Sequence, residues 1–446
     1  CEGLVGSEMC IRDRFIGVFF SVFFIASPVL SKTVITWWGE GSAVRDPDVI
    51  DIIENRFNAQ HDDIELDIVF KEEVSETTRT ALLSGTGPDI FESPGPSYIK
   101  MFQDAGFVKS LDQYDKKYGW QDKLLPWAYN SGVFDGEFYA FPKNYESMIY
   151  FYNKTLFEEN GWSLPTNLTE YEALAETIQA KGMYPFAYGA QGWQPTHEHL
   201  AGNYINTVAG PDNMYKALIG EKKWTDPEFV ESLKLLKKHM DAGYWSGSLE
   251  NYYALGWDDF NGQFANRDSA MLMIGSWGFN PTVSGFADKT DEWDWAPLPM
   301  LTPEGGTPNY QLAIGSTISI NAASENADTA AYVLDWVISN REQVLELTGR
   351  FNFGAWLLPL KYQESDFGDV DPRIKRFLMD FAKTTGEGNY GYTTWSFFAA
   401  DPGVHIWKDM EVVWANDITV EEFLEDHQKL WDKARKNDNT LPIGDR

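Results

Sequence analysis

Short apolar runs alternate with helical repeats along the first part of the chain. Residues 34–38, 64–70 and 89–91 are rich in β-branched and aromatic side chains and have the length of strands. Between the first two runs, residues 49–57 carry apolar side chains at helical spacing. Two strands joined by a helix are typical of a βαβ unit with a parallel sheet. The pattern therefore predicts an α/β fold.

The segment 135–153 contains a turn signal and two aromatic runs. Asp135-Gly136 readily adopts the positive φ of a tight turn, and the runs on either side of Pro142 have the composition of strands. Between them, residues 143–146 place polar groups and an aromatic ring at a break in the predicted sheet. We interpret this break as a crossing between two bodies, with an elbow that faces a ligand.

The later part of the chain is mostly helical, with a buried strand at 270–274. Residues 295–299 indicate a second crossing, and a third is expected after the helix at 327–339. A chain of 446 residues is also too large for one ordinary core. We therefore expect two lobes with the following composition: lobe 1 contains 32–143 and 297–338, and lobe 2 contains 144–296 and 339–446.

The amino-terminal segment 1–31 is expected to lie outside both lobes. Two arginines precede an apolar run at 15–26, and small residues follow it up to Ser31. This order is typical of a signal peptide cleaved after Ser31, and the run is shorter than the roughly 20 residues that span a membrane. Residues 1–12 resemble translated sequencing-adapter sequence, so we expect a non-native leader before the signal peptide.

Cysteine usage and charge narrow the cellular setting. Cys1 and Cys10 are the only cysteines, and both precede the apolar run. The mature chain would therefore have no disulfide and no lipid-accepting cysteine. An exported chain without a lipid anchor would be lost from a cell that lacks an outer membrane, so we expect the periplasm. The net charge of −31 argues against a nucleic-acid partner and against anionic membrane surfaces, because both require a basic face.

The sequence contains no G-x-S-x-G elbow, no Walker-type phosphate loop and no H-E-x-x-H motif. His197 and His199 flank Glu198 and could donate two nitrogens to a metal, but a lone cluster in a polar segment is better explained as solvated. We expect no metal and no cofactor. A glycoside hydrolase needs two carboxylates roughly 5–9 Å apart. No pair is singled out among the 67 acidic residues, so a secreted hydrolase stays open as an alternative.

Polar and aromatic candidates for ligand contact lie at predicted strand ends and in loops. Glu40 and Glu92 follow the first and third strands, where ligands of open α/β sheets collect. The aromatic content is high, at 15%, and the apolar faces of Trp and Tyr stack on sugar rings. The aromatic candidates are Trp38, Tyr145, Trp193, Trp277 and Trp407. Trp277 lies between two glycines that allow close backbone approach, so its ring can present a face to a ligand.

An ordered set of short motifs resembles the bacterial extracellular solute-binding proteins of sugar ABC transporters, the family that includes maltose-binding protein. The motifs cover nearly all of residues 32–435 in the family's order: G-T-G-P-D at 85–89, D-G through P at 135–142, Y-F-Y-N-K at 150–154, G-S-W at 275–277, P-L-P at 297–299 and I-N-A-A at 320–323. The resemblance implies a two-lobed periplasmic binding protein fold of type II. It also implies three inter-lobe crossings and a sugar bound between the lobes.

By matching motifs, the resemblance implies roles for particular residues. Glu146 falls where the maltose-binding relative has a sugar-binding carboxylate, and Glu40 matches another polar contact. Trp277 matches a stacking tryptophan. Trp193 lies in a loop that supplies aromatic and polar contacts, and Trp407 lies near a further stacking position.

The resemblance implies a monomeric, non-enzymatic protein that delivers a carbohydrate to the permease subunits of an ABC transporter. The aromatic residues Trp37, Trp38 and Tyr145 favour an oligosaccharide over a small polar solute. A milder alternative keeps the fold but binds a non-sugar solute such as a polyamine.

Overall fold

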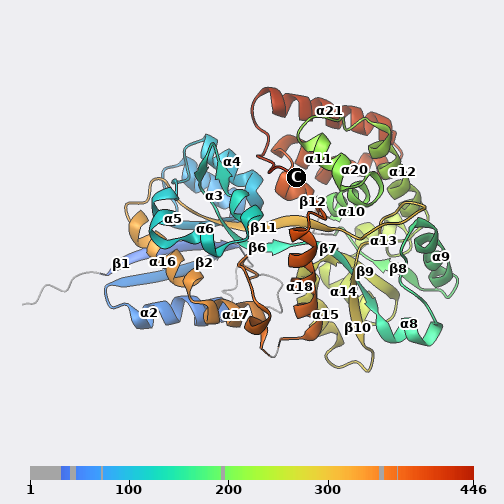
Figure 1. The fold of residues 1–446 in the computed structure, drawn as a ribbon, viewed down its shortest axis with the longest axis horizontal. Helices are drawn as coiled ribbons and strands as arrows, with labels where there is room; N and C mark the ends of the chain where they lie inside the picture. The colour runs from blue at the N-terminus through green and yellow to red at the C-terminus, as the bar shows by residue number, and fades with distance from the viewer. Residues whose placement is uncertain (1–31, 41–46, 72–73, 192–195, 351–355, 369) are drawn as a thin grey trace, which may run out of the picture.

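The computed structural model shows two bodies side by side, joined by strands that run from one to the other (Figure 1). It describes residues 32–40, 47–71, 74–191, 196–350, 356–368 and 370–446. The expected signal segment 1–31 and the candidate Trp193 lie outside these residues. No helix in the described part of the chain is long and apolar enough to cross a bilayer.

The sheet of lobe 1 is built on parallel strands with one antiparallel neighbour. β1 (Thr33–Glu40) lies between β2 (Ile64–Lys71) and β3 (Ile90–Ser93), and it is parallel to both. The long strand β11 (Tyr310–Ile320) pairs antiparallel with β3. The predicted strands and their parallel pairing are therefore confirmed.

Helices cover both faces of this sheet (Figure 1). Trp37 of β1 lies in a core with the helical segment after it and with α16, whereas Phe91 of β3 packs against α3 and α4 on the other face. The helices of lobe 1 are α1 (Pro47–Val49), a π-helix (Ile50–Asn55), α2 (Arg56–Gln60), α3 (Val74–Leu83), α4 (Gly95–Asp104), α5 (Asp112–Tyr118), α6 (Trp120–Lys123), α7 (Pro126–Asn130), α16 (Ala327–Ser339) and α17 (Arg341–Arg350). The hairpin strands β4 (Val133–Phe134) and β5 (Glu137–Phe138) turn at Asp135-Gly136, both with positive φ, as the turn signal predicts.

The first crossing joins two consecutive strands. β6 (Phe141–Glu146) pairs with β11 in the lobe 1 sheet, and β7 (Met148–Asn153) pairs with strands of lobe 2. Only Ser147 separates β6 from β7, and it accepts one hydrogen bond from a residue of β11 and another from a residue of lobe 2. Its Oγ accepts from the Gln311 backbone N–H at 2.9 Å, and its carbonyl accepts from the Ser276 N–H at 2.9 Å. We propose that the chain changes lobe at Ser147 and not at Pro142.

The lobe 2 sheet has the order β10-β7-β9-β8, with β10 (Trp293–Pro297), β9 (Ser269–Gly275) and β8 (Tyr184–Ala187). Its helical segments are α8 (Lys154–Asn160), α9 (Leu168–Gln179), α10 (Thr196–Tyr204), a π-helix (Ile205–Ala209), α11 (Pro211–Leu218), α12 (Pro227–Asp241), α13 (Leu249–Ala254), α14 (Trp257–Ala265), a 3-10 turn (Ser276–Gly278), α15 (Phe279–Phe286), a 3-10 turn (Glu364–Phe367), α18 (Pro372–Gly386), α19 (Thr394–Phe397), α20 (Ala400–Trp414) and α21 (Val420–Lys436).

The second crossing lies within β11. The loop before this strand stays on lobe 2, since the Leu301 N–H donates to the Thr207 carbonyl at 2.8 Å and Thr302 accepts from the Leu168 N–H at 3.1 Å. The start of β11 pairs with β12 (Tyr390–Tyr392), and its end pairs with β3 of lobe 1. We therefore propose a crossing inside β11, later than the expected boundary at 297.

The third crossing also comes later than expected. Val344 and Leu347 of α17, together with Trp356, belong to the core of lobe 1, whereas Phe377 and Phe381 of α18 belong to the core of lobe 2. Because these helices bury their apolar faces in different cores, we propose that the chain returns to lobe 2 between residues 360 and 372, after the expected boundary at 339.

Candidate functional site

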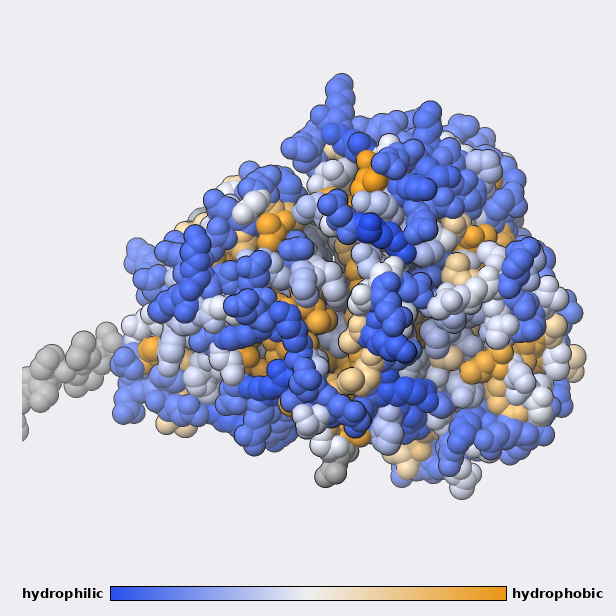
Figure 2. Space-filling model, in the orientation of Figure 1, coloured by the Kyte–Doolittle hydropathy of each residue, from blue (hydrophilic) through white to orange (hydrophobic). Residues whose placement is uncertain are grey.

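A cavity of about 410 Å³ lies between the two lobes. Lobe 1 contributes the end of β1 and the start of α4, and lobe 2 contributes α10, α19 and α20. The face in Figure 2 is mainly hydrophilic, with hydrophobic residues visible in the groove between the two bodies. The lining residues are Glu40, Pro94, Ser97, Tyr98, Met101, Glu198, Thr394, Trp395, Phe398, Ala399, Ala400, Gly403, Val404 and Trp407.

The lobe 1 wall follows from the sheet. β1 and β3 are parallel and end at the same edge, so Glu40 and the start of α4 meet there. Pro94 precedes α4, and Pro96 sits at the start of the helix, where a missing N–H is tolerated. Tyr98 and Met101, one helical turn apart, face the cavity from α4. The element order of lobe 1 therefore delivers one carboxylate, one phenol and one apolar side chain to the cleft.

The lobe 2 wall is mainly apolar and carries two half-buried tryptophans, Trp395 and Trp407. Trp395 of α19 and Phe398 precede α20, which contributes Val404 and Trp407. Val404 is 43% exposed, and Met101 on the opposite wall is 41% exposed. Exposed apolar side chains that gather at one place on a soluble protein mark an interaction site. The cavity therefore presents apolar surface from both lobes to its contents.

Two carboxylates face this apolar surface. Glu198 accepts a hydrogen bond of 2.8 Å from Thr394 Oγ1, yet its burial raises its pKa to about 7. Burial raises the pKa of Glu40 as well; the Lys143 ammonium opposes this rise and the Glu92 carboxylate adds to it. The pKa of Tyr98 is raised by burial and then by Glu198 and Glu40. Tyr98 therefore lies within the field of both acids, one from each lobe.

Glu92, the second strand-end candidate, lies beneath the cavity wall. It is buried and accepts from Lys143 Nζ at 2.6 Å and from the Glu40 backbone N–H at 2.9 Å. Lys143 also lies 4.5 Å from the Trp356 ring centroid. Glu92 therefore holds the end of β1 in place, and it is not among the described residues that line the cavity.

Glu146 lies at the first crossing. Asn144 Nδ2 donates to its Oε1 at 2.7 Å. Its carboxylate lies against Gly315 of β11, where an added Cβ would come within 2.2 Å of Oε1 and would displace the carboxylate. Burial and the nearby Glu40 raise the pKa of Glu146 to about 8, against the opposing effects of Asn144 and Lys143. Glu146 is close enough to Glu40 to share its electrostatic field, but it lies at the hinge side of the cleft.

Two aromatic candidates lie away from the cavity lining. Tyr145, expected to contact the ligand, is 2% exposed and packs between Trp127 and Phe381 in the lobe 2 core. Trp38 packs against the core under α3 and α4, and Lys71 Nζ lies 4.5 Å from its ring centroid. Both positions are typical of packing residues.

Trp277 lies next to the lining and not in it. Its ring folds over Gly275, where an added Cβ would meet the ring at 2.0 Å. It packs against His199 at 5.2 Å and against Trp395 at 6.0 Å between ring centroids. Gly275 therefore makes room for the Trp277 ring within the protein, whereas we expected the flanking glycines to let this ring present a face to a ligand. Trp395, and not Trp277, lines the cavity. Of the aromatic candidates that the structure describes, Trp407 lines the cavity.

Several lining residues carried no clear sequence signal. Tyr98 lies within α4 and Phe398 lies between α19 and α20, and the tertiary fold determines where both are placed. Trp395 is one of the tryptophans that the sequence places at the end of an element or in a loop, without marking it further. Glu198 was considered only as part of a possible metal cluster with its two flanking histidines. The described residues contain no group of three metal-ligating side chains, and His199 Nδ1 is instead 2.7 Å from the Tyr188 hydroxyl.

Comparison with known families and curated proteins finds solute-binding and sugar-binding proteins. The family model of the bacterial extracellular solute-binding proteins matches residues 44–344. A probable sugar-binding periplasmic protein of Brucella melitensis biotype 1 is 28% identical over 207 residues, which is 46% of each chain. The chain thus spans about half the length of the curated relatives it matches.

Solved structures match over almost their whole length. A chitin oligosaccharide binding protein has a TM-score of 0.75 at 20% identity, covering 91% of this chain and 99% of that one. A solute-binding protein in complex with raffinose has a TM-score of 0.68 at 18% identity, covering 90% and 99%. These likenesses confirm the two-lobed α/β fold expected from the sequence.

Proposed function

The chain belongs to the family of bacterial extracellular solute-binding proteins, and from this premise we propose that it binds a carbohydrate between its lobes and delivers it to the permease of an ABC transporter. We propose the periplasm as its location and the monomer as its working form. The family is one of binding proteins, so the ligand is expected to leave unchanged. The similar chitin oligosaccharide and raffinose binding proteins support a sugar as the ligand class.

The observation that carries the proposal is the composition of the two facing walls. Trp395 and Trp407 are half-buried and offer flat apolar rings, onto which the C–H faces of a sugar can stack. Glu40 and Glu198 offer anionic acceptors for the sugar hydroxyls. Hydrogen bonds to charged groups contribute about 1.5–3 kcal/mol each. Aromatic faces on the lobe 2 wall, with one carboxylate from each wall, therefore suit a neutral polyhydroxylated ring.

Binding would be coupled to closure of the lobes. Glu40 and Glu198 come from different lobes, so one ligand that contacts both acids stabilises the arrangement in which the walls face each other. The proposed crossings at Ser147, within β11 and between residues 360 and 372 would act as the hinge. The closed form would then present the permease with a shape that the empty protein adopts less often.

Calorimetry of the mature chain, residues 32–446, against mono- and oligosaccharides tests this proposal. We expect saturable binding of one sugar per chain, with the sugar recovered unchanged after prolonged incubation. Release of new reducing ends would instead identify a hydrolase. Binding of a polyamine, with no response to any sugar, would keep the fold but overturn the ligand class.

A further inference from the structure

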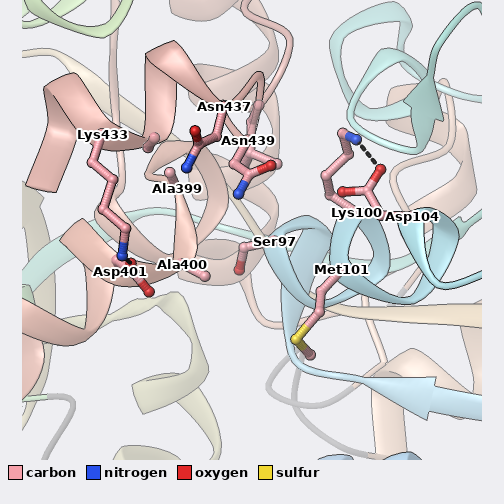
Figure 3. A pocket seen from close by; sticks show the side chains of 12 residues that line it. Ser97, Lys100, Met101, Asp104, Ala399, Ala400, Asp401, Lys433, Asn437 and Asn439 are labelled. Atoms are coloured by element: carbon pink, nitrogen blue, oxygen red, sulfur yellow. Dashed lines mark hydrogen bonds and ion pairs between the residues drawn. The ribbon is translucent and has the colours of Figure 1, made fainter.

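A second cavity of about 280 Å³ adjoins the cavity between the walls. The two share four lining residues: Ser97, Met101, Ala399 and Ala400. Figure 3 shows this second cavity, with the α4 side chains on one side and those near α20 and α21 on the other. Binding sites for small molecules usually have volumes of about 300–1,000 Å³. The smaller cavity is therefore better explained as an extension of the first than as an independent site.

The lining of the second cavity is more polar than that of the first and contains two ion pairs. An ion pair of Lys433 and Asp401, 2.8 Å apart, lies on one side, and an ion pair of Lys100 and Asp104 lies on the other (Figure 3). Both cations are thus already matched by anions within the lining. A charged ligand would have to separate a pair, whereas a neutral hydroxylated ligand can hydrogen-bond to the paired groups as they stand.

Two asparagines complete this polar lining. The side chains of Asn437 and Asn439 lie between the ion pairs, with Asn439 near Ser97 (Figure 3). Neither side-chain amide makes a hydrogen bond to another residue in the part of the chain that the structure describes. Each amide offers both donors and an acceptor. Hydroxyl groups of a sugar, which are donors and acceptors at once, match such groups.

The wall that carries these asparagines is fixed at two places. Leu441 is buried in the lobe 1 core beside Ile99 and Phe102. Five residues later, Arg446 pairs with Asp212 of lobe 2 at 2.9 Å. The segment 437–446 therefore contacts both lobes, and its exposed asparagine side chains line the cavity. Binding to a segment that is already anchored costs less conformational entropy than binding to a free segment.

We propose that the second cavity binds the continuing units of a linear neutral oligosaccharide whose first units stack in the aromatic cavity. This inference rests on the proposed function. Met101 and Ala400 line both cavities, so a ligand chain that fills the first lies next to the second. The ligand class is thereby narrowed from carbohydrate to oligosaccharides long enough to occupy both.

The test is the length dependence of affinity, measured by calorimetry on the mature chain. Malto-, cello- and chito-oligosaccharides from disaccharide to hexasaccharide serve as ligands. In the series that binds, Kd is expected to fall about tenfold with length and then to level off. The double variant Asn437→Ala/Asn439→Ala is expected to reduce the ratio of disaccharide to hexasaccharide Kd about tenfold. Lys436→Ala, on the same segment but outside the lining, is the matched control and keeps the wild-type ratio.

The possible failures are distinguishable. If disaccharide and hexasaccharide bind equally well, or if the double variant keeps the wild-type ratio, the second cavity is not a sugar site, while the proposed function stands. If no sugar of any length binds, the proposed function fails and this inference fails with it. Thermal unfolding of both variants, with the Tm expected to match wild type, shows whether a changed ratio reports on binding or on folding.

Discussion

Lys143 donates a hydrogen bond of 2.6 Å to Glu92, and the two side chains are only 6% and 3% exposed. The same Glu92 oxygen accepts from the backbone N–H of Glu40. The buried pair therefore links the crossing strand β6 to β3 and to the end of β1. One corner of the ligand cavity depends on this link, since Glu40 is the β1 residue that lines it.

Replacing Lys143 by methionine should strongly destabilise the protein. Lys143→Met keeps the length of the side chain but leaves the Glu92 charge buried without its partner, which typically costs about 3–5 kcal/mol. Urea unfolding of the ligand-free protein at neutral pH measures this change. Lys234→Met is the matched control, because Lys234 and its partner Glu421 are 47% and 49% exposed. Surface pairs contribute about 0–1 kcal/mol. Equal losses in the two variants would contradict a special role for the buried pair.

The crossing strands show how much of the fold can be predicted from local sequence patterns. The sequence pattern predicted the hairpin, both strands and the existence of a crossing, but it placed the lobe change at Pro142. In the structure β6 runs through Pro142, which pairs with Thr317 of β11. Among the described strands, β11 is the only neighbour of β6, so its other edge has no ladder that needs the missing proline N–H. A proline in a predicted strand can therefore lie inside a strand at the edge of a sheet, and it need not mark the end of the strand.

Of the two acids expected at strand ends, Glu40 lines the cavity and Glu92 lies beneath its wall. Glu40 lines the cavity because parallel strands bring their carboxyl ends to one edge. Tyr145 and Glu146 alternate on one strand, so their side chains point to opposite faces, and the face given to Tyr145 is the core. Glu198 and Trp395 are almost 200 residues apart in sequence. No local pattern specifies that they meet.

Removing the Trp407 ring should weaken sugar binding. Trp407→Ala takes one stacking surface from the cavity, and the lost packing and stacking should raise Kd at least about tenfold. Calorimetry with the best sugar of the screen measures the change. Trp162→Ala is the control, because Trp162 packs against Phe157 on lobe 2 and is not part of the lining. An unchanged Kd in Trp407→Ala would place the sugar elsewhere.

Sugar affinity should depend on pH through Glu198. Its pKa of about 7 means that the carboxylate gains its charge as pH rises from 6 to 8. An ionised acceptor binds hydroxyl donors more strongly than a protonated one, so Kd is expected to fall about threefold to tenfold over this range. Glu198→Gln cannot ionise and should show a flat profile by calorimetry at pH 6, 7 and 8. If Kd of Glu198→Gln changes with pH as steeply as Kd of wild type, a group other than Glu198 is responsible for the pH dependence.

Glu146 should make the ligand-free protein less stable at alkaline pH. Its pKa is raised from 4.5 to about 8, so the folded state holds a proton that the unfolded state loses. The resulting stability is full below pH 4.5 and is lost as pH rises through 8. Glu146→Gln has no proton to lose, so its free energy of unfolding should gain about 4 kcal/mol over that of wild type between pH 5 and pH 9. Urea unfolding at pH 5 and pH 9 measures the difference. If the difference in free energy of unfolding between Glu146→Gln and wild type is the same at pH 5 and pH 9, the raised pKa of Glu146 is contradicted.

A buried histidine should impose the opposite pH dependence. His427 is fully buried, and its ring packs edge-on against Trp224 at 5.3 Å and near Phe398 and His405. Neither ring nitrogen has a hydrogen-bond partner among the described residues, and burial lowers its pKa from 6.5 to about 3. The stability that depends on its neutral form is present above pH 6.5 and is lost as pH falls towards 3, because the unfolded chain binds the proton first.

His427→Phe keeps an aromatic ring at this position without buried nitrogens. Between pH 7.5 and pH 5 the variant should gain about 2 kcal/mol over wild type in urea unfolding. If wild type and His427→Phe lose the same free energy of unfolding between pH 7.5 and pH 5, His427 does not determine the loss of stability at acid pH.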